Sequence, residues 1–233
     1  MKTVILAAGK GKRMGEITQD IPKPMVRVGG KPILEYIITG LRDHAGVKDF
    51  FIITGHRAEV IEEYFKDGSG LGVSCTYQRQ FVQDGTGKAP ELAEQWLNQE
   101  PFLLTYGDVL MDPEDYAGMV EAFTADGVIS VKKGENVSLG GAVVFDKDFI
   151  LQDLVEKGST AISPWYNAGI YILPSCVFEF TRKLKKSVRG EYELTDALKA
   201  MAQNGKKLKG YEIKRRWADV RDPEVLDRLN KGW

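Results

Sequence analysis

The sequence is poor in cysteine and histidine, has no long apolar run and carries almost no net charge. Its cysteines, Cys75 and Cys176, and its two histidines form no C-x-x-C pattern and no histidine-rich cluster, so neither a disulfide framework nor a zinc site is expected. No apolar run approaches the roughly 20 residues that a membrane-spanning helix needs. The apolar stretch after Lys2 is only about five residues long, too short for the core of a signal peptide. We therefore expect a cytoplasmic protein with no membrane partner.

The near-zero net charge hides an uneven distribution along the chain. The 32 Lys and Arg residues oppose 33 Asp and Glu residues, but residues 1–31 carry a net charge of +5, residues 32–181 a net charge of -13 and residues 182–216, the basic block, a net charge of +8. A nucleic-acid-binding surface usually makes a whole domain basic, which a pI of about 6.2 does not support. We therefore expect a small anionic ligand and no nucleic-acid partner, and the basic block is typical of a solvated face.

The first half of the chain alternates strand-like and helix-like segments. Apolar runs bounded by turn residues predict strands, and apolar residues at helical spacing predict helices. The predicted strands are residues 2–7, 49–54, 73–78, 102–106 and 128–131. The predicted helices are residues 33–45, 58–65, 91–97 and 113–123. Five strands alternating with four helices predict an α/β fold with a parallel, doubly wound sheet and helices on both faces.

The alternation of predicted strands and helices ends after residue 132. Residues 140–145, 149–155 and 167–173 are strand-like, with short connections and no long helix between the first two. They predict a small antiparallel insertion added to the parallel sheet. Further helices are expected at residues 175–186, 194–204 and 223–229, and a further strand at residues 208–213.

A glycine-rich segment follows the first strand directly. Residues 9–13 read Gly-Lys-Gly-Lys-Arg, and we refer to them as the glycine loop. Glycines let the backbone N–H groups of such a loop face an anion, and the lysines and arginine add charged donors for phosphate oxygens. The segment is not a P-loop, and it misfits the dinucleotide-binding pattern because its third glycine, Gly15, comes one position late. The second strand also ends in Thr54-Gly55-His56 and not in the acid that binds a ribose.

A lysine between two prolines follows about ten residues later, at Pro22-Lys23-Pro24. The prolines hold the backbone extended and restrict where the ammonium can go. Such a lysine can act as a fixed charge on a reacting phosphate. Taken alone, the tripeptide is equally compatible with a surface turn.

Residues 6–14, together with Pro22-Lys23-Pro24, resemble the signature of the sugar-1-phosphate nucleotidyltransferases, and the similarity extends to about residue 230. The resemblance implies a Rossmann-like, GT-A-like nucleotidyltransferase fold in a single domain, with a nucleotide-binding part at residues 1–132 and a sugar-phosphate-binding part at residues 133–233. It implies a Mg²⁺-dependent displacement at the α-phosphate of a nucleoside triphosphate, with UTP or dTTP favoured. The products are a nucleotide sugar and pyrophosphate, and the expected oligomeric state is a monomer or homodimer.

The resemblance also implies roles for individual residues. Arg13 and Lys23 are the expected catalytic residues, the first neutralising the departing pyrophosphate and the second lying at the α-phosphate. The expected nucleotide-binding residues are Leu6, Ala7, Ala8, Gly9, Gly11, Lys12, Gln80, Gly85 and Thr86. The expected sugar-phosphate-binding residues are Gly141, Glu156, Lys157 and Asn167. Asp108 and Asp219 are the expected Mg²⁺ ligands.

The residues themselves support parts of this assignment. Asp108 and Asp219 each follow a strand-like run, so both can reach the carboxyl edge of a sheet, and two carboxylates suit Mg²⁺. Each is also compatible with a simple turn or helix start. The amide of Gln80 can both donate and accept, which suits a uracil or thymine edge.

Three other functions compete with this one. A CTP-dependent cytidylyltransferase acting on phosphocholine would share the loop and the Pro-Lys-Pro, and Trp165 and Tyr166 could form the aromatic cage that a quaternary ammonium prefers. An NAD(P)-dependent short-chain oxidoreductase is disfavoured because none of the nine tyrosines begins a Tyr-x-x-x-Lys motif. A regulatory module that has lost catalysis is disfavoured because the charged residues expected at the reaction centre are all present.

Overall fold

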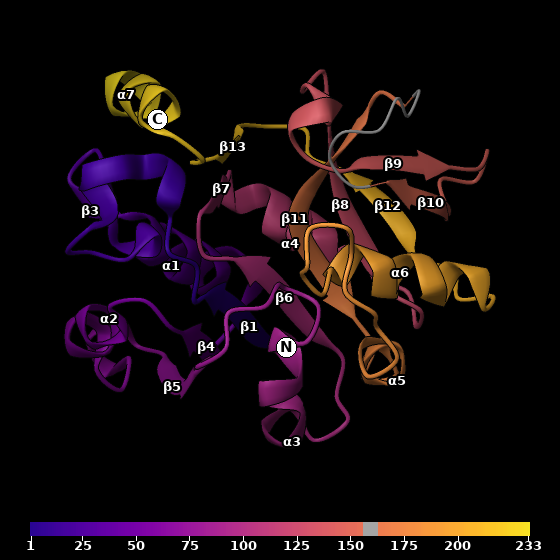
Figure 1. The fold of residues 1–233 in the computed structure, drawn as a ribbon, viewed down its shortest axis with the longest axis horizontal. Helices are drawn as coiled ribbons and strands as arrows, with labels where there is room; N and C mark the ends of the chain where they lie inside the picture. Colours follow the sequence, from indigo (N-terminus) through magenta and orange to yellow (C-terminus); the bar gives the residue numbers. More distant parts are fainter. Residues whose placement is uncertain (156–162) are drawn as a thin grey trace. The chain divides into compact units, whose positions relative to one another are not determined.

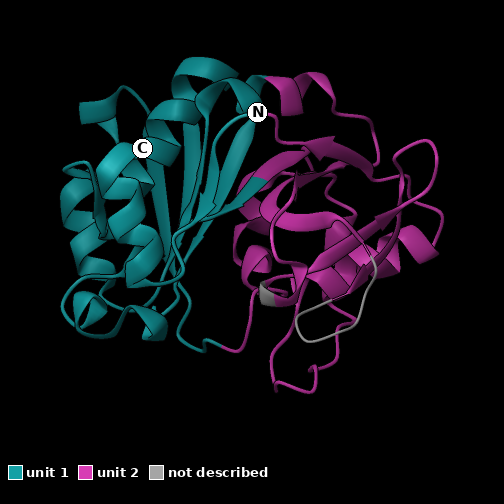
Figure 2. Ribbon diagram, turned by 90° about the horizontal axis from the view of Figure 1, so that it is seen from above, with its two compact units in different colours: residues 1–83, 104–117, 215–233 teal, residues 84–103, 118–214 magenta. Residues whose placement is uncertain are grey.

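The computed structural model describes residues 1–155 and 163–233, without the side chain of Leu139. The chain divides into two compact units, each assembled from separate stretches of sequence (Figures 1 and 2). Unit 1 comprises residues 1–83, 104–117 and 215–233, and unit 2 comprises residues 84–103 and 118–214. No helix among these described residues has the length and apolar character to cross a membrane.

Unit 1 is built on parallel strands. Its strand order is β6-β1-β4-β5, formed by β1 (Lys2–Ala7), β4 (Asp49–Thr54), β5 (Ser74–Arg79) and most of β6 (Phe102–Tyr106). β4 runs parallel to both β1 and β5 without a register break. The apolar residues of β1 and β4 other than Leu6 are buried, as expected for strands covered on both faces. The carboxyl ends of β1 and β4 therefore lie side by side.

Helices and two short ribbons complete unit 1. The helices are α1 (Ile33–Ala45), α2 (Ala58–Phe65), the first part of α4 (Pro113–Glu121) and α7 (Pro223–Gly232). The antiparallel ribbons pair β2 (Arg27–Val28) with β3 (Lys31–Pro32), and β7 (Val109–Met111) with β13 (Trp217–Asp219). α1 ends at Gly46, which takes the left-handed conformation that favours glycine. α7 begins after Asp222, whose carboxylate accepts a hydrogen bond from the Val225 N–H, the usual capping arrangement.

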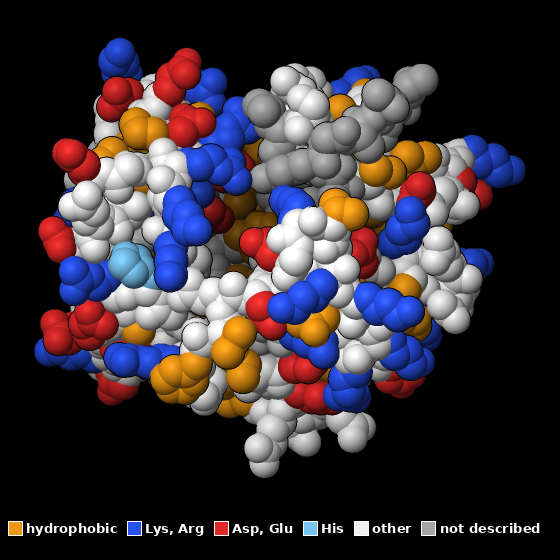
Figure 3. All heavy atoms as spheres, in the orientation of Figure 1, with side chains coloured by type: hydrophobic (Ala, Val, Ile, Leu, Met, Phe, Trp, Pro, Cys, Tyr) orange, Lys and Arg blue, Asp and Glu red, His pale blue; other side chains and the backbone are white. Residues whose placement is uncertain are grey.

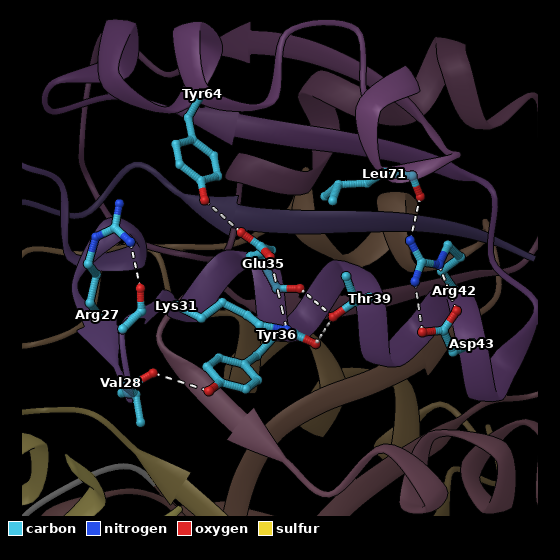
Figure 4. A network of polar contacts seen from close by, with 11 residues as sticks. Arg27, Val28, Lys31, Glu35, Tyr36, Thr39, Arg42, Asp43, Tyr64 and Leu71 are labelled. Carbon is cyan, nitrogen blue, oxygen red and sulfur yellow. Dashed lines mark hydrogen bonds and ion pairs between the residues drawn. The ribbon is translucent and has the colours of Figure 1, made fainter.

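A polar network on α1 ties this helix to its neighbours in unit 1 (Figure 4). The Tyr64 hydroxyl of α2 donates to the Glu35 carboxylate across 2.7 Å, and this hydrogen bond raises the pKa of Tyr64. The Tyr36 hydroxyl donates to the Val28 carbonyl across 3.1 Å. α1 is therefore joined to α2 on one side and to β2 on the other.

Unit 2 is mainly antiparallel. Its strands are β8 (Val128–Lys133), β9 (Ala142–Phe145), β10 (Leu151–Val155), β11 (Trp165–Leu173) and β12 (Lys209–Glu212). β9 pairs antiparallel with β10 and β11, and β11 pairs antiparallel with β8. β12 pairs parallel with β8. The helices of this unit are α3 (Glu94–Leu97), the end of α4, α5 (Val177–Thr181) and α6 (Leu194–Gln203).

The predicted α/β fold with a mostly parallel sheet and an antiparallel addition is confirmed, with two errors in its elements. Residues 128–131 were expected to be the fifth strand of the parallel series, but β8 belongs to unit 2 and pairs antiparallel with β11. Alternation of strands and helices gives the order of elements, not the pairing of each strand. The first four residues of β8, Val-Ile-Ser-Val, are all buried and three of them are apolar, which suits a strand in either orientation. The expected helix at residues 175–186 is also too long, because α5 ends at Thr181.

Candidate functional site

The glycine loop leaves β1 with an open backbone. A Cβ atom at Gly9 would have no neighbour within 4 Å, whereas one at Gly11 would lie 3.1 Å from Thr18 Cγ2 and 3.2 Å from Lys23 Cβ. Gly11 also has a φ of +62°, which disfavours any other residue. The loop is therefore open to solvent at its first glycine and packed tightly against Lys23 at its second.

The three cations of the glycine loop are exposed. Lys10, Lys12 and Arg13 lie on the surface of unit 1, and none of them forms an ion pair with another residue of the described chain. The 3-10 turn that follows, Lys12–Thr18, is anchored by Met14, which is 1% exposed. The loop therefore presents three charges that have no ion-pair partner at residues 1–155 and 163–233, on a backbone fixed at its far end.

Lys23 lies against two carboxylates. Its backbone lies in the 3-10 turn Lys23–Met25 directly after Pro22, which is extended, so the extended backbone predicted for Lys23 itself was wrong. Its ammonium forms an ion pair with Asp108 and lies 3.8 Å from Asp219 Oδ1. Only 13% of the Lys23 side chain is exposed. Three residues predicted to act together are therefore brought together within unit 1.

The ribbon of β7 and β13 brings the two aspartates together. Asp219, at the end of β13, pairs with Val109, the first residue of β7. Val220 N–H donates to the Asp108 carbonyl across 3.0 Å. Two residues more than a hundred positions apart are thereby held on neighbouring backbones.

Gly107 connects this ribbon to the end of β1. Its N–H donates to the Leu6 carbonyl across 2.9 Å. A Cβ atom at this position would lie 2.9 Å from Pro24 Cγ and 3.2 Å from the Leu6 carbonyl oxygen, so a larger residue would push the Asp108 backbone away from Lys23. The Gly-Asp pair is therefore more than a generic turn.

The donor set fits a magnesium ion. Asp108 and Asp219 reach the same cationic group, and their side chains are 28% and 22% exposed. Mg²⁺ typically takes one or two protein carboxylates and completes its octahedron with water and phosphate oxygens. In the described part of the chain, no group of three or more His, Cys, Asp or Glu side chains is arranged so that it could hold a metal ion. An ion held by the two aspartates would therefore keep positions for substrate oxygens.

Gln80 and the turn after β4 lie at the same edge of the unit 1 strands. Gln80 follows β5, and its N–H donates to the Thr54 carbonyl at the end of β4 across 2.8 Å. The turn at residues 55–57 contacts the chain on both sides of the glycine loop, a role that sequence reasoning missed. A Gly-His pair after the strand beside β1 was the signal that could have indicated it.

Gly85 and Thr86 lie in unit 2, where they pack against the chain before α6. Gly85 forms a parallel bridge with Tyr192, and a Cβ atom at Gly85 would lie 2.2 Å from the Tyr192 carbonyl oxygen. Leu194 N–H donates to the Thr86 hydroxyl across 3.3 Å. The glycine at position 85 is therefore required by the protein's own backbone, whatever ligand the loop also contacts.

Gly141 and Asn167 are neighbours in unit 2. Asn167 N–H donates to the Gly141 carbonyl across 2.8 Å, and the Asn167 amide is hydrogen-bonded to the Tyr171 hydroxyl. Two of the predicted sugar-binding residues are therefore adjacent. The other two, Glu156 and Lys157, lie outside the described residues.

Trp165 and Tyr166 are engaged in packing. The Trp165 ring lies edge-on to Phe145 and Phe149, with centroids 6.4 and 5.1 Å away, and Lys133 Nζ lies 5.6 Å from its centroid. Tyr166 is 3% exposed. A quaternary ammonium needs open aromatic faces, so this arrangement weakens the phosphocholine alternative.

Comparison with known families gives one match over nearly the whole chain. The family model described as nucleotidyl transferase matches residues 2–231.

Similar proteins agree with this match. A bifunctional protein GlmU of the archaeon Methanococcus maripaludis is 37% identical over 233 residues, which are 99% of this chain and 54% of the relative. The chain thus spans about half the length of the bifunctional GlmU relatives that it matches. A solved structure described as a putative glucose-1-phosphate thymidylyltransferase of Bacillus anthracis has a TM-score of 0.89 at 26% identity, covering 99% of this chain and 94% of that one. A structure of a UDP-glucose pyrophosphorylase with UDP-glucose has a TM-score of 0.89 at 25% identity, covering 99% and 97%.

Proposed function

Because the chain belongs to the nucleotidyl transferase family, we propose that it transfers a nucleotidyl group from a nucleoside triphosphate to a sugar 1-phosphate. The observation that carries this proposal is the placement of Lys23 against Asp108 and Asp219, with its Cβ packed on the glycine loop. The similar solved structures, one of a putative glucose-1-phosphate thymidylyltransferase and one of a UDP-glucose pyrophosphorylase, support this reaction class.

In the proposed reaction a phosphate oxygen of the sugar 1-phosphate forms a bond to the α-phosphorus. The bond from that phosphorus to the bridging oxygen breaks, and pyrophosphate leaves with the electron pair. Both reactants are polyanions, so positioning and charge neutralisation supply most of the catalysis. A Mg²⁺ ion held by Asp108 and Asp219 would add positive charge at the phosphates.

The residues of unit 1 have complementary parts in this reaction. The N–H groups of the glycine loop and the Lys12 side chain bind the triphosphate. Arg13 neutralises the departing pyrophosphate, and Lys23 stabilises the charge that develops at the α-phosphate. Lys23 exchanges its carboxylate partners for the phosphate when substrate binds, which suits a lysine on a short and restricted turn.

We further propose UTP or dTTP as the nucleotide. The amide of Gln80 can donate to and accept from an imide edge, and the two similar structures are described with thymidylyl and UDP chemistry. Gly141 and Asn167 would contact the sugar, and Glu156 and Lys157 would contact the sugar and its phosphate.

A pyrophosphate-release screen tests the proposal. The chain is assayed with MgCl₂ and each of ATP, GTP, CTP, UTP and dTTP, against a panel of sugar 1-phosphates and phosphocholine, with products identified by mass. We expect release with UTP or dTTP and a sugar 1-phosphate, and loss of that release in Lys23→Met. Release only with CTP and phosphocholine would support the alternative transferase, and no release with any pair would contradict the reaction class.

A further inference from the structure

The turn after β4, residues 55–57, contacts the chain just before the glycine loop. His56 N–H donates to the Ala8 carbonyl across 3.3 Å. A Cβ atom at Gly55 would lie 2.6 Å from the same carbonyl oxygen, so this close approach requires glycine. The start of the loop is therefore fixed by the backbone of the neighbouring strand.

The same turn contacts the chain after the loop. His56 Nε2 lies 3.0 Å from the Thr18 carbonyl oxygen, and because a carbonyl can only accept, the ring nitrogen is the donor. The Arg57 guanidinium donates to the Gln19 carbonyl across 3.2 Å and to the Asp20 carboxylate across 3.0 Å. Arg57 has a φ of 51°, a conformation that costs free energy in a residue other than glycine. The strained turn therefore connects both flanks of the loop.

Thr18 connects the turn at residues 55–57 to the glycine loop itself. Its hydroxyl donates to the Gly11 carbonyl across 3.0 Å, and the residue is only 3% exposed. Gly11 in turn packs on Lys23, since a Cβ atom there would lie 3.2 Å from Lys23 Cβ. A continuous series of contacts therefore runs from the His56 ring through Thr18 and Gly11 to the lysine of the proposed reaction centre.

We propose that His56 is a positioning residue, which fixes the glycine loop in the shape that binds a triphosphate. The proposal rests on the proposed function only for the identity of the ligand. His56 acts through Thr18 and does not itself touch the phosphates. Loss of its ring should therefore weaken nucleotide binding and leave the chemical step mostly intact, because the loop must be ordered anew at each binding event.

The test compares His56→Ala with His56→Gln, whose amide N–H can replace the ring donor, and with His44→Ala. His44 is the other histidine of the chain and lies exposed near the end of α1. Binding of MgUTP and MgdTTP to the full chain is measured by calorimetry, and amide hydrogen exchange is followed over residues 8–20. For His56→Ala we expect a dissociation constant raised by about tenfold, the loss of one good hydrogen bond. Exchange should be faster at residues 9–18 and unchanged in α1 and α2.

The other variants and the kinetics decide between positioning and general destabilisation. His56→Gln should restore binding to within about threefold of the original chain, and His44→Ala should match the original chain. KM for the nucleotide should rise more than kcat falls. Unchanged binding and exchange in His56→Ala would overturn the proposal, and so would faster exchange throughout unit 1 or equal defects in the alanine and glutamine variants.

The same measurements separate this inference from the proposed function. If the original chain binds neither nucleotide and releases no pyrophosphate, the proposed function fails. Faster exchange confined to residues 9–18 in His56→Ala would still support the positioning role in that case. If the original chain is active and His56→Ala is indistinguishable from it, the positioning role alone fails.

Discussion

Two basic regions of this chain look alike in the sequence and differ in the structure. The cations of the glycine loop have no ion-pair partner among the described residues. Seven of the twelve Lys and Arg residues of the basic block form ion pairs with residues that the structure describes. These are Arg182–Glu94, Arg189–Glu193, Lys199–Asp153, Lys206–Asp126 and Lys214–Glu212 in unit 2 and Arg215–Glu114 and Arg216–Asp112 in unit 1. Over the region of α5 and α6, Figure 3 shows Lys and Arg side chains interspersed with Asp and Glu side chains. Basic charge thus indicates an anionic ligand only where the fold leaves it unpaired.

The origin of the acidic partners explains the uneven charge of the sequence. Glu94, Asp126 and Asp153 all come from the middle of the chain, which has a net charge of -13 over residues 32–181. Acidic residues of that segment therefore offset basic residues of the basic block at these three ion pairs of unit 2. The glycine loop has no such compensation in the described residues, which leaves its charges available for an anion such as the proposed triphosphate.

The largest expected effect tests whether the reaction centre lies beside the glycine loop. Asp108→Asn should lower kcat by at least about two orders of magnitude, because it removes a carboxylate from the electrostatic centre of the reaction. The measurement is steady-state pyrophosphate release at saturating MgCl₂. Asp153→Asn, which removes a carboxylate paired with Lys199 of the basic block, is the matched control and should change kcat less than twofold. Near-original turnover in Asp108→Asn would remove this residue from the metal site.

A second comparison replaces one arginine in each region. Arg13→Ala should lower kcat/KM for the nucleotide by about tenfold to hundredfold, the range for losing hydrogen bonds to a charged group. Arg182→Ala should leave kcat/KM within about twofold, since that side chain is engaged with Glu94. Equal losses in both variants would break the distinction between the regions.

The residues of the proposed reaction centre could be predicted from the sequence more fully than the elements that bring them together. Strands with continuous apolar runs, such as β1 and β4, have the predicted bounds. Burial on both faces of a sheet requires apolar residues at successive positions, and such a run is visible in the sequence. Asp108 and Asp219 were expected to converge because each follows a strand-like run; they do lie together, but Asp219 is brought there by the separate ribbon of β7 and β13. The ribbon of β7 and β13 escaped prediction because three-residue strands have no periodicity to detect.

Other features depend on partners that no local pattern specifies. The requirement for glycine at position 85 comes from the Tyr192 backbone, more than a hundred residues later in the chain. The His56 contact with Thr18 joins two turns, and turns have no periodic signal. The pairing of the basic block could not be read from charge counts, because a count does not say which acid lies opposite which base.

Ionic strength should separate the two regions without any substitution. Raising KCl from about 0.1 M to about 1 M shortens the Debye length from about 10 Å to about 3 Å. KM for the nucleotide should rise several-fold, because the exposed cations of the glycine loop attract a polyanion through solvent. The melting temperature should change little, since exposed ion pairs such as those of the basic block contribute on the order of 0–1 kcal/mol each. A large fall in melting temperature with an unchanged KM would reverse the roles assigned to the two regions.

The smallest expected effect concerns a single ion pair of the basic block. Lys199 Nζ lies 2.7 Å from Asp153 Oδ1, with 35% and 42% of the two side chains exposed. Lys199→Gln should lower the free energy of unfolding by less than about 0.5 kcal/mol, because water screens the charges and ordering two long side chains costs entropy. The measurement is urea unfolding monitored by tryptophan fluorescence, with nucleotide KM determined on the same samples. A change in KM larger than about twofold would mean that the basic block takes part in attracting the substrate, and the division between paired structural charge and unpaired binding charge would then fail at this residue.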